Sequence, residues 1–553
     1  MSDVSNRSQM LTRWGMLKSE RSSWMAHYKE ISDYLLPRSG RFFIQDRNKG
    51  ERRHNNIYDS TGTRALRVLG AGLMGGATSP ARPWFRLAVQ DESVMQSAAV
   101  KLWLSQVTTM MFNVFQRSNT YRALHSMYEE MGAFGTTASL VTDDFQDVIR
   151  HYPLTTGEFC IAQNYRGEVC TLYREYQKTV GELVGEFGRD KCSLTVQNLY
   201  DRGALDSWVT VIHAIEPRSD RDPRKVDALN MAWSSKQFEI GATEGQYLRE
   251  SGFKTFPALT PRWATSGGDI YGNSPGMEAL GDIKQLQHEQ LRKAQGIDYM
   301  TKPPLQVPVS MKNMGVETLP GGISYVDMST PHSGIKTAFE VRLDLSHLLG
   351  DIQDVRSRIK ETFYTDLFLM LANQTDSRMT ATEVAERHEE KLLMLGPVLE
   401  RLHNELLDPL IDMTFARLVA SGTLPPPPPE LHGLDLNVEY VSVLAQAQRA
   451  VATNGIDRFV GNLGQVAQFK PDVLDNFDSD KWAEMYSDML GVDPQLIVPG
   501  PQVALIRKNR AQQQAQQAKM EQIQQATQAA KNLGQTPTNG GNAASDVMGM
   551  FSQ

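Results

Sequence analysis

Tyr271-Gly-Asn-Ser-Pro-Gly-Met-Glu-Ala-Leu280 opens the part of the chain that decides the fold. Asn273 or Ser274 can cap a helix whose first residue is Pro275, because a proline at the first helical position loses no hydrogen bond. We therefore expect a helix that begins at this proline and runs to about Gly296.

A proline- and glycine-rich insert and a second helix follow. Lys302-Pro-Pro-Leu-Gln-Val-Pro308 begins the insert, which extends to Pro331 with short extended pieces. The pattern then predicts a helix over 338–371, which would be roughly 50 Å long at 1.5 Å per residue. The polar segment Asn373-Gln-Thr-Asp-Ser-Arg-Met379 breaks this helix.

The third helix begins within Met379-Thr-Ala-Thr-Glu-Val384. Thr380 can cap it, and Glu383 stands three residues further on, as in a capping box. Pro397 follows Gly396 and predicts a kink. Leucines recur along this helix at helical spacing, at positions Leu392, Leu395, Leu399, Leu402, Leu406 and Leu410.

The residues before this stretch predict helices and then short strands. Apolar spacing indicates helices over about 11–36, 101–115 and 121–134. From Thr136 to Arg262 the period changes to that of strands, whose connections are too short for many crossover helices. We expect an α+β fold, mainly α, with antiparallel pairing in this region.

The C-terminal residues are polar. Residues 503–531 are rich in Ala and Gln and predict a helix that has little to bury, so it must pack against copies of itself or stay frayed. Residues 534–553 contain Gly, Asn and Ser and are typical of a disordered tail.

The composition is that of a soluble globular protein of several domains. The 553 residues are 41% hydrophobic and 22% charged, with a net charge of −7. A net negative charge argues against a surface that binds nucleic acid by neutralising many phosphates. We expect a cytoplasmic protein for three reasons. The sequence has only three cysteines, its N-terminus has no apolar leader, and no apolar run is long enough to span a membrane.

A literal G-x-G-x-x-G occurs at Gly70-Ala-Gly72-Leu-Met-Gly75. A dinucleotide site needs a buried strand before this motif and a helix after it. Here Arg64–Leu69 has mixed polarity, and Pro80 and Pro83 stand where the helix should follow. The motif instead predicts a helix whose small residues allow close packing.

Other candidate motifs also lack the context that their chemistry needs. Gly272-Asn-Ser-Pro-Gly276 matches G-x-S-x-G, but Pro275 has no N–H for an oxyanion hole. His288-Glu289 is followed by Arg292 where a zinc site needs histidine. Asp143-Asp144 reads as a solvated turn between strands. We expect no catalytic, cofactor or metal site.

The chain resembles the head-to-tail connecting proteins, or portal proteins, of short-tailed bacteriophages. The resemblance rests first on Tyr271–Leu280 followed by Asp282-Ile-Lys284. Further matching segments lie in the family's order, at Ser79-Pro-Ala-Arg-Pro-Trp-Phe-Arg-Leu87, Arg262-Trp263, Lys302-Pro-Pro-Leu305, Pro320-Gly-Gly-Ile323, Thr382-Glu-Val384 and Leu395-Gly-Pro397. They cover most of the chain.

The resemblance implies a portal fold assembled as a ring of twelve, through which double-stranded DNA enters the capsid and later leaves. It divides the chain into wing (1–270), first stem helix (271–300), clip (301–335), second stem helix (336–367), tunnel loop (368–380), kinked wing helix (381–424), spacer and wing or crown helices (425–502), crown or barrel helix (503–533) and tail (534–553).

Functional residues follow from the resemblance as expectations. For DNA contact in the tunnel loop we expect Asn373, Gln374, Ser377 and Arg378. For docking at the clip we expect Lys302, Lys312, Glu317 and Asp327. Candidates for the stem channel are Asp344, Asp351, Asp354, Arg358 and Glu361, for which pairing between subunits is an equal alternative.

The implied partners are other copies of the chain, the terminase large subunit, capsid and scaffolding proteins, tail adaptor or nozzle proteins, and core or ejection proteins at the crown. The expected location is the portal vertex of the virion, with the host cytoplasm during assembly. Two alternatives remain open from the residues. The leucine stripe favours a coiled-coil scaffold, and the two glycine motifs favour a nucleotide-binding or hydrolytic enzyme.

Overall fold

The fold is described from a computed structural model. It describes residues 2–42, 56–95, 97–242, 246–307, 345–372, 394–442 and 500–534, with shorter stretches between 309 and 338 and between 444 and 498. The chain divides into two compact units, Met1–Val451 and Ala452–Gln553.

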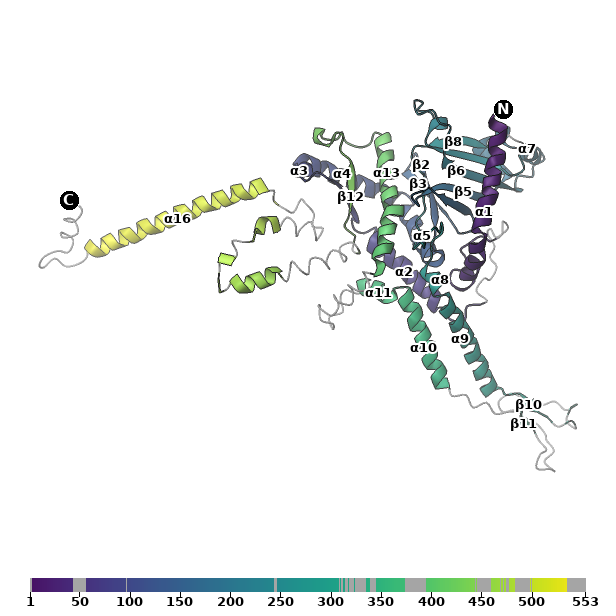
Figure 1. Ribbon diagram of the computed structural model, residues 1–553. Helices are drawn as coiled ribbons and strands as arrows, with labels where there is room; N and C mark the ends of the chain where they lie inside the picture. Colours follow the sequence, from purple (N-terminus) through teal and green to yellow (C-terminus); the bar gives the residue numbers. More distant parts are fainter. Residues whose placement is uncertain are drawn as a thin grey trace. The chain divides into compact units, whose positions relative to one another are not determined.

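The first unit contains antiparallel sheets, as the short connections predict (Figure 1). Five strands pair in chain order as a meander: β4 (Phe159–Gln163), β5 (Val169–Thr179), β6 (Trp208–Pro217), β7 (Trp233–Glu239) and β8 (Arg249–Phe253). A second sheet has the order β3-β2-β9, formed by β3 (Val148–Leu154), β2 (Ala138–Asp144) and β9 (Ala258–Leu259). Two further pairs are β1 (Phe85–Val89) with β12 (Leu436–Tyr440) and β10 (Leu305–Gln306) with β11 (Lys336–Thr337).

Helices cover these sheets and build the main core. Their bounds in the N-terminal part are α1 (Ser2–Tyr34), α2 (Thr61–Ala77), α3 (Glu92–Met95), α4 (Ala98–Arg117), α5 (Thr120–Phe134), α6 (Val180–Phe187) and α7 (Leu194–Asp201). Buried side chains of α2, α4 and α5 share one cluster, which includes Leu69, Val107 and Met127. The predicted helices of this part are confirmed, although α1 begins nine residues earlier than expected.

The G-x-G-x-x-G segment lies inside α2 and serves helix packing. A Cβ atom on Gly72 would lie 2.2 Å from Cγ of Phe368. A Cβ atom on Gly70 would lie 2.8 Å from Cγ of Glu129, on α5. The glycines therefore let other elements approach α2, which confirms the interpretation of close packing.

The sequence Tyr271–Leu280 starts a helical hairpin as predicted. The Ser274 side chain accepts a hydrogen bond from the Met277 N–H at 3.1 Å, and Pro275 is the first helical residue. A short break at Ala279 separates α8 (Pro275–Glu278) from α9 (Leu280–Thr301), so the helix reaches beyond the expected end at Gly296.

The prediction of one continuous helix over 338–371 is wrong. The structure has two helices, α10 (Leu345–Thr362) and α11 (Thr365–Ala372). Tyr364 lies between them with a φ of 52°, which interrupts the helix. Residues 368–372, assigned above to a loop, belong to α11.

Residues 394–402 are helical, so the third helix runs through Pro397, while its predicted start at Thr380 lies outside the described residues. A π-helical turn, His403–Leu407, follows, and then α13 (Asp408–Ala420). The leucines of the stripe that the structure describes are all buried in the main core, at positions Leu395, Leu399, Leu402, Leu406 and Leu410. This burial removes the apolar seam that a coiled coil would need.

Strand boundaries differ most from expectation. Asp143 and Asp144 are the last residues of β2, so placing them in a turn is wrong. Asp143 forms an ion pair with Arg417 of α13, and Asp144 lies 3.8 Å from Arg150 of β3. The strands β1 and β12 lie outside the region in which strands were predicted, and the helices α3 and α7 were not predicted.

The described part of the second unit is mostly α16 (Gly500–Gly534), which confirms the predicted Ala- and Gln-rich helix. Its described side chains are almost all exposed. The Phe477 ring is tilted against the rings of Phe459 and Trp482, at ring-centroid distances of 6.4 Å and 5.9 Å. The tail predicted over 534–553 lies outside the described residues after Gly534.

Glu130 is a buried carboxyl of the first unit that forms no ion pair with any other described residue. Glu130 of α5 is 6% exposed, and its Oε1 accepts a hydrogen bond from the Thr155 hydroxyl at 2.6 Å. Burial raises the pKa of Glu130, the hydrogen bond from Thr155 lowers it and the nearby Glu158 carboxyl raises it, and the overall pKa is about 7. Glu130 is therefore largely protonated below that pH.

We expect Glu130→Gln to change the pH dependence of stability. The unfolded carboxyl ionises near pH 4.5 and the folded one near pH 7, so the wild-type protein loses stability as the pH rises across this range. The variant should match the wild type at pH 4 and exceed it by about 3 kcal/mol at pH 8. Urea unfolding at both pH values measures this difference.

The matched control is Glu129→Gln, the same change at the partly exposed neighbouring residue. It should leave the pH dependence close to that of the wild type. A Glu130→Gln variant with an equal effect at pH 4 and pH 8 would contradict the assignment.

Candidate functional site

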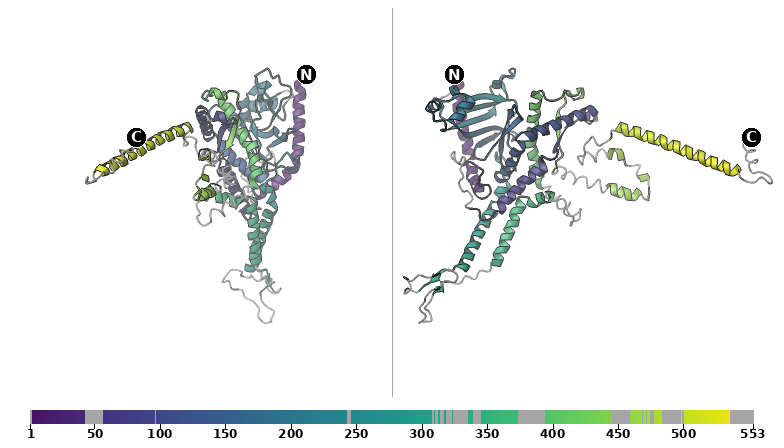
Figure 2. Two further views of the ribbon diagram at one scale, coloured as in Figure 1. Left: turned by 60° about the vertical axis from the view of Figure 1, so that its left-hand side comes forward. Right: turned by 180° about the vertical axis from the view of Figure 1, so that it is seen from behind.

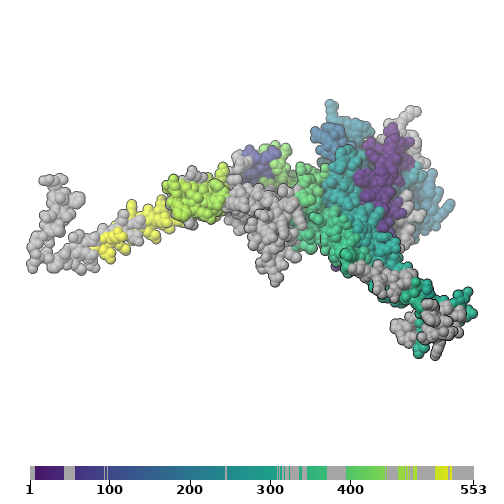
Figure 3. All heavy atoms as spheres, turned by 60° about the horizontal axis from the view of Figure 1, so that its bottom comes forward, coloured from purple at the N-terminus to yellow at the C-terminus, as the bar shows by residue number. Residues whose placement is uncertain are grey.

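The helices α9 and α10 form a hairpin that projects from the rest of the first unit (Figure 2). They pack against each other, and α10 turns Ile352, Val355 and Ile359 into the main core. The space-filling view shows the teal and green atoms of this hairpin extending beyond the body of the unit (Figure 3). Most other side chains of α10 remain exposed and polar.

One exposed face of α10 carries the charges expected of the stem. Spacings of three and four residues place Asp351, Asp354, Arg358 and Glu361 on this face. Arg358 lies 3.4 Å from Asp282 of α9 and 3.7 Å from Asp354. We call these four α10 residues, together with Asp282, the acidic flank.

A buried carboxyl on α9 borders the acidic flank. Glu289 accepts a hydrogen bond from the Gln285 amide at 2.7 Å. Burial raises the pKa of the Glu289 carboxyl, and the adjacent Asp351 carboxyl raises it as well. This part of the hairpin therefore concentrates negative charge.

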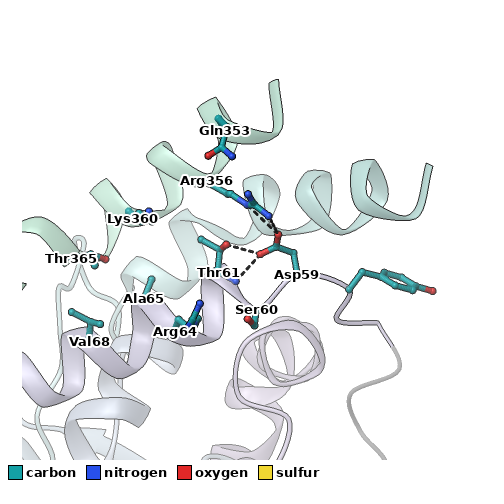
Figure 4. Close-up of a pocket in the computed structure, with 11 residues that line it drawn as sticks. Asp59, Ser60, Thr61, Arg64, Ala65, Val68, Gln353, Arg356, Lys360 and Thr365 are labelled. Atoms are coloured by element: carbon teal, nitrogen blue, oxygen red, sulfur yellow. Dashed lines mark hydrogen bonds and ion pairs between the residues drawn. The ribbon is translucent and has the colours of Figure 1, made fainter. Parts of the chain in front are cut away.

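The opposite side of α10 borders a groove with a volume of about 450 Å³ (Figure 4). Arg64, Arg356 and Lys360 contribute three cations, and Asp59 contributes one carboxylate. We call it the basic groove, lined by Tyr58, Asp59, Ser60, Thr61, Arg64, Ala65, Val68, Gln353, Arg356, Lys360 and Thr365.

Asp59 fixes one end of the basic groove. Its carboxylate accepts hydrogen bonds from the Thr61 N–H at 2.8 Å and from Arg356 Nη2 at 2.7 Å, as Figure 4 shows. Gln290 of α9 also donates to it, at 3.1 Å. Burial alone would raise the pKa of Asp59, but the bonds from Thr61 and Arg356 lower it overall. Asp59 thus joins the start of α2 to both helices of the hairpin.

A second polar junction ties the hairpin's base to the sheets. Arg262 is 4% exposed, and its guanidinium donates to Glu405 at 2.7 Å and to the Gly167 carbonyl at 2.8 Å. Glu405 belongs to the π-helical turn. The junction therefore connects the turn between β4 and β5, the segment before Tyr271, and the third helix.

The two G-x-S-x-G glycines pack against the end of α5. Ser274 is fully buried and donates its hydroxyl to the Ala133 carbonyl at 2.8 Å. A Cβ atom on Gly276 would lie 2.6 Å from that carbonyl, and one on Gly272 would lie 2.4 Å from the Gly135 carbonyl. The motif thus docks the start of the hairpin onto the body.

The structure brings together only some of the predicted site residues. Asp351, Asp354, Arg358 and Glu361 share one face of α10, and Lys302, Lys312 and Glu317 are exposed in the segment between α9 and α10. Other predicted residues lie outside the described part of the chain, namely Asp327, Asp344, Asn373, Gln374, Ser377 and Arg378.

The sequence analysis did not predict the ion pair between Asp59 and Arg356. They are 297 positions apart, and no pattern in the sequence links them. Across the described residues, no group of three or more His, Cys, Asp or Glu side chains could hold a metal ion. None of the described helices is both long enough and apolar enough to cross a membrane.

Comparison with known proteins assigns the family. Residues 7–498 match the family model of the bacteriophage head to tail connecting protein. The chain belongs to this family. As a family member it is similar to the "Probable portal protein" of Bordetella phage BPP-1, with 66% identity over 554 residues that cover 100% of both chains.

A second relative of this connecting protein is the "Portal protein" of Salmonella phage epsilon15. The two are 45% identical over 535 residues, which cover 96% of each chain. Among solved structures, a chain from the "Virion of native gene transfer agent (GTA) particle" aligns over 73% of this chain and 86% of its own length. It is 10% identical with a TM-score of 0.32, too low to bear on the fold.

Proposed function

We propose that this chain is the portal subunit of a bacteriophage, which forms the channel at one capsid vertex. DNA would be packaged through this channel and later ejected, and the tail would attach to it. The similarity to two portal proteins over 96% or more of the chain carries the proposal. The α9–α10 hairpin supports it, because a projecting pair of helices in every subunit would line a ring with helices.

The parts of the chain take the following roles in this proposal. The hairpin of α9 and α10 is the stem, and the residues between these helices form the clip. The body around the sheets and α13 is the wing, and α16 contributes to a crown or barrel. We propose twelve subunits, with Asn373, Gln374, Ser377 and Arg378 in a loop that contacts DNA.

The charge of the chain suits a channel through which DNA slides. With a net charge of −7, the sequence has no surplus of cations for neutralising phosphates. Each phosphate neutralised by Lys or Arg adds a salt-sensitive attraction, so a weakly basic wall would hold DNA too tightly. A ring repeats every residue in each subunit, which multiplies this effect.

The structure favours the portal over the two alternatives. Ser274 is fully buried and occupied as a helix cap, so it cannot serve as an exposed nucleophile. Gly72 contacts Phe368, where a dinucleotide site would need room for pyrophosphate. The described leucines of the supposed coiled-coil stripe lie in the core.

We further propose the partners and location that the portal role requires. The terminase large subunit would engage the clip during packaging, and tail adaptor or nozzle proteins would replace it afterwards. Capsid and scaffolding proteins would contact the wing, and core or ejection proteins the crown. The ring would assemble in the host cytoplasm and remain at the portal vertex of the virion.

Electron microscopy of the purified protein tests the proposal. We expect rings with a central hole, most of them with twelve subunits. Elongated rods would favour a scaffold, and a monomer that binds nucleotide or cleaves an ester would favour an enzyme. Either outcome would contradict the portal assignment.

Deletion of Asn373 to Arg378 should leave the rings intact and reduce packaged DNA at least tenfold. Replacement of the same six residues by Gly and Ser keeps the chain length and tests the side chains separately. Packaging is measured as DNA protected from nuclease inside capsids. Rings that package and retain DNA normally after the deletion would rule out the DNA contact.

A further inference from the structure

The two charged sides of α10 lie on either side of its buried stripe. Asp351, Asp354 and Arg358 each precede a buried residue by one position, and Gln353, Arg356 and Lys360 each follow one. At 3.6 residues per turn, the two sets are roughly 160° apart around the helix. The acidic flank and the basic groove therefore face opposite ways.

Both sides carry charges that form no ion pair with another described residue. Arg64 and Lys360 of the basic groove form no ion pair with any described residue, and neither does Glu361 of the acidic flank. The third cation of the groove, Arg356, is paired with Asp59. Within the described part of the chain, Arg64 and Lys360 thus remain unpaired, and they favour an anionic occupant of the groove.

The groove also contains a buried donor that lacks an acceptor. Thr365 is 6% exposed and lines the groove (Figure 4). Its Oγ1 has no hydrogen-bond partner among the described residues. A buried hydroxyl left unpaired costs free energy, so an acceptor entering the groove would stabilise it.

We propose that the basic groove receives the acidic flank of α10 from a second copy of this chain. The inference rests on the proposed ring and assigns the contact between neighbouring stems. A closed ring needs two different, complementary surfaces on opposite sides of each subunit. The acidic flank and the basic groove meet that requirement in charge and in direction.

Ring symmetry sets the register of the contact. Neighbouring subunits are related by rotation without translation, so groups at the same height meet. Lys360 and Glu361 are successive residues and lie within about 1.5 Å of each other along α10. Glu361 of one copy therefore reaches Lys360 and Arg64 of the next, where Thr365 donates its hydroxyl to the carboxylate.

This contact changes the role expected for two stem-channel candidates. Asp354 and Glu361 pair with the neighbouring subunit and do not face DNA in the bore. Cations of the groove are likewise neutralised by protein carboxylates. A groove that binds DNA phosphates is the competing arrangement, and the experiment separates the two.

The test uses two full-length variants with reversed charges. Arg64→Glu/Lys360→Glu makes both sides of the contact acidic, and Asp354→Lys/Glu361→Lys makes both sides basic. Each variant alone should associate at least tenfold more weakly than the wild type in 0.15 M salt. An equal mixture should regain rings, because alternating subunits restore every opposite-charge contact. Native mass spectrometry and electron microscopy measure assembly.

The control is Arg224→Glu/Lys225→Glu, which makes the same charge change in an exposed loop away from α10. It should assemble as the wild type does. Circular dichroism checks that each variant is folded. If a reversed variant unfolds, Lys360→Gln and Glu361→Gln replace it, each with an expected threefold or greater weakening of association.

The outcomes distinguish this inference from the proposed function. Wild-type rings together with reversed variants that assemble normally would overturn the inference alone, as would a mixture that stays unassembled. Normal rings of Arg64→Glu/Lys360→Glu that fail to retain DNA would assign the groove to DNA instead. A wild-type protein that forms no ring would contradict the proposed function and the inference together.

Discussion

Replacement of Arg262 by alanine should lower the free energy of unfolding by about 3–5 kcal/mol, the range for breaking a buried ion pair. The guanidinium donates to Glu405, to the Gln163 side chain at 3.2 Å and to two backbone carbonyls, of Gly167 and Ile270. Alanine leaves these acceptors without their donor, and the Glu405 charge remains in a mostly buried position. Urea unfolding of the purified protein measures the loss.

Arg401→Ala is the matched control for this prediction. Arg401 also pairs with Glu405, at 3.1 Å, but its side chain is partly exposed. Its removal should cost less than about 1 kcal/mol. Arg262→Lys should be intermediate, because an ammonium keeps the charge and loses the planar fork. Equal losses for Arg262→Ala and Arg401→Ala would contradict a special role for the buried guanidinium.

Gly135→Ala should destabilise the protein by about 3 kcal/mol, through backbone strain and a steric clash. Gly135 ends α5 with a φ of 74°, in the left-handed region. A Cβ atom there would also lie 2.1 Å from the Gly272 carbonyl oxygen, which a rigid backbone cannot withdraw. The change should separate the start of the hairpin from α5. Thermal unfolding and the yield of assembled rings measure it.

The control replaces a glycine that has space around it. Gly281 lies in α9, and no atom comes within 4 Å of a Cβ placed on it. Gly281→Ala should be neutral or stabilise the helix by up to about 1 kcal/mol. If Gly135→Ala unfolds at the same temperature as the wild type, the tight contact with Gly272 is not present in solution.

Local chemistry made the start of the hairpin predictable. Ser274 and Pro275 define a helix start through groups within four residues, and the structure confirms it. The antiparallel sheet was predictable for a similar reason, since short connections permit few other arrangements. Strand β12 was missed because its partner β1 lies in a distant part of the sequence.

The break before α11 depends on tertiary contacts. Phe363 and Leu367 are both buried, and Tyr364 lies 6.3 Å from the Trp263 ring between centroids. The apolar pattern of residues 363–371 is compatible with one uninterrupted helix, so periodicity alone predicted no break. Packing against α2 determines the actual course.

The charged residues of the site could be predicted from the sequence, but the directions in which they face could not. The charges of α10 are plain in the sequence, but their faces became known only from the burial of Ile352, Val355 and Ile359. Asp59 follows a basic segment without helical periodicity, and its role depends on Arg356 far along the chain. Tertiary structure alone brings such a pair together.

The pairing of β1 with β12 has a consequence for synthesis on the ribosome. Phe85 pairs with Tyr440, about 350 residues later in the chain. At 5–20 residues per second, β1 waits roughly 20–70 s for its partner to be made. During that time its hydrogen-bonding edge is open to other strands, including those of neighbouring nascent chains. A slowed ribosome between these strands would lengthen the exposure and favour aggregation over assembly.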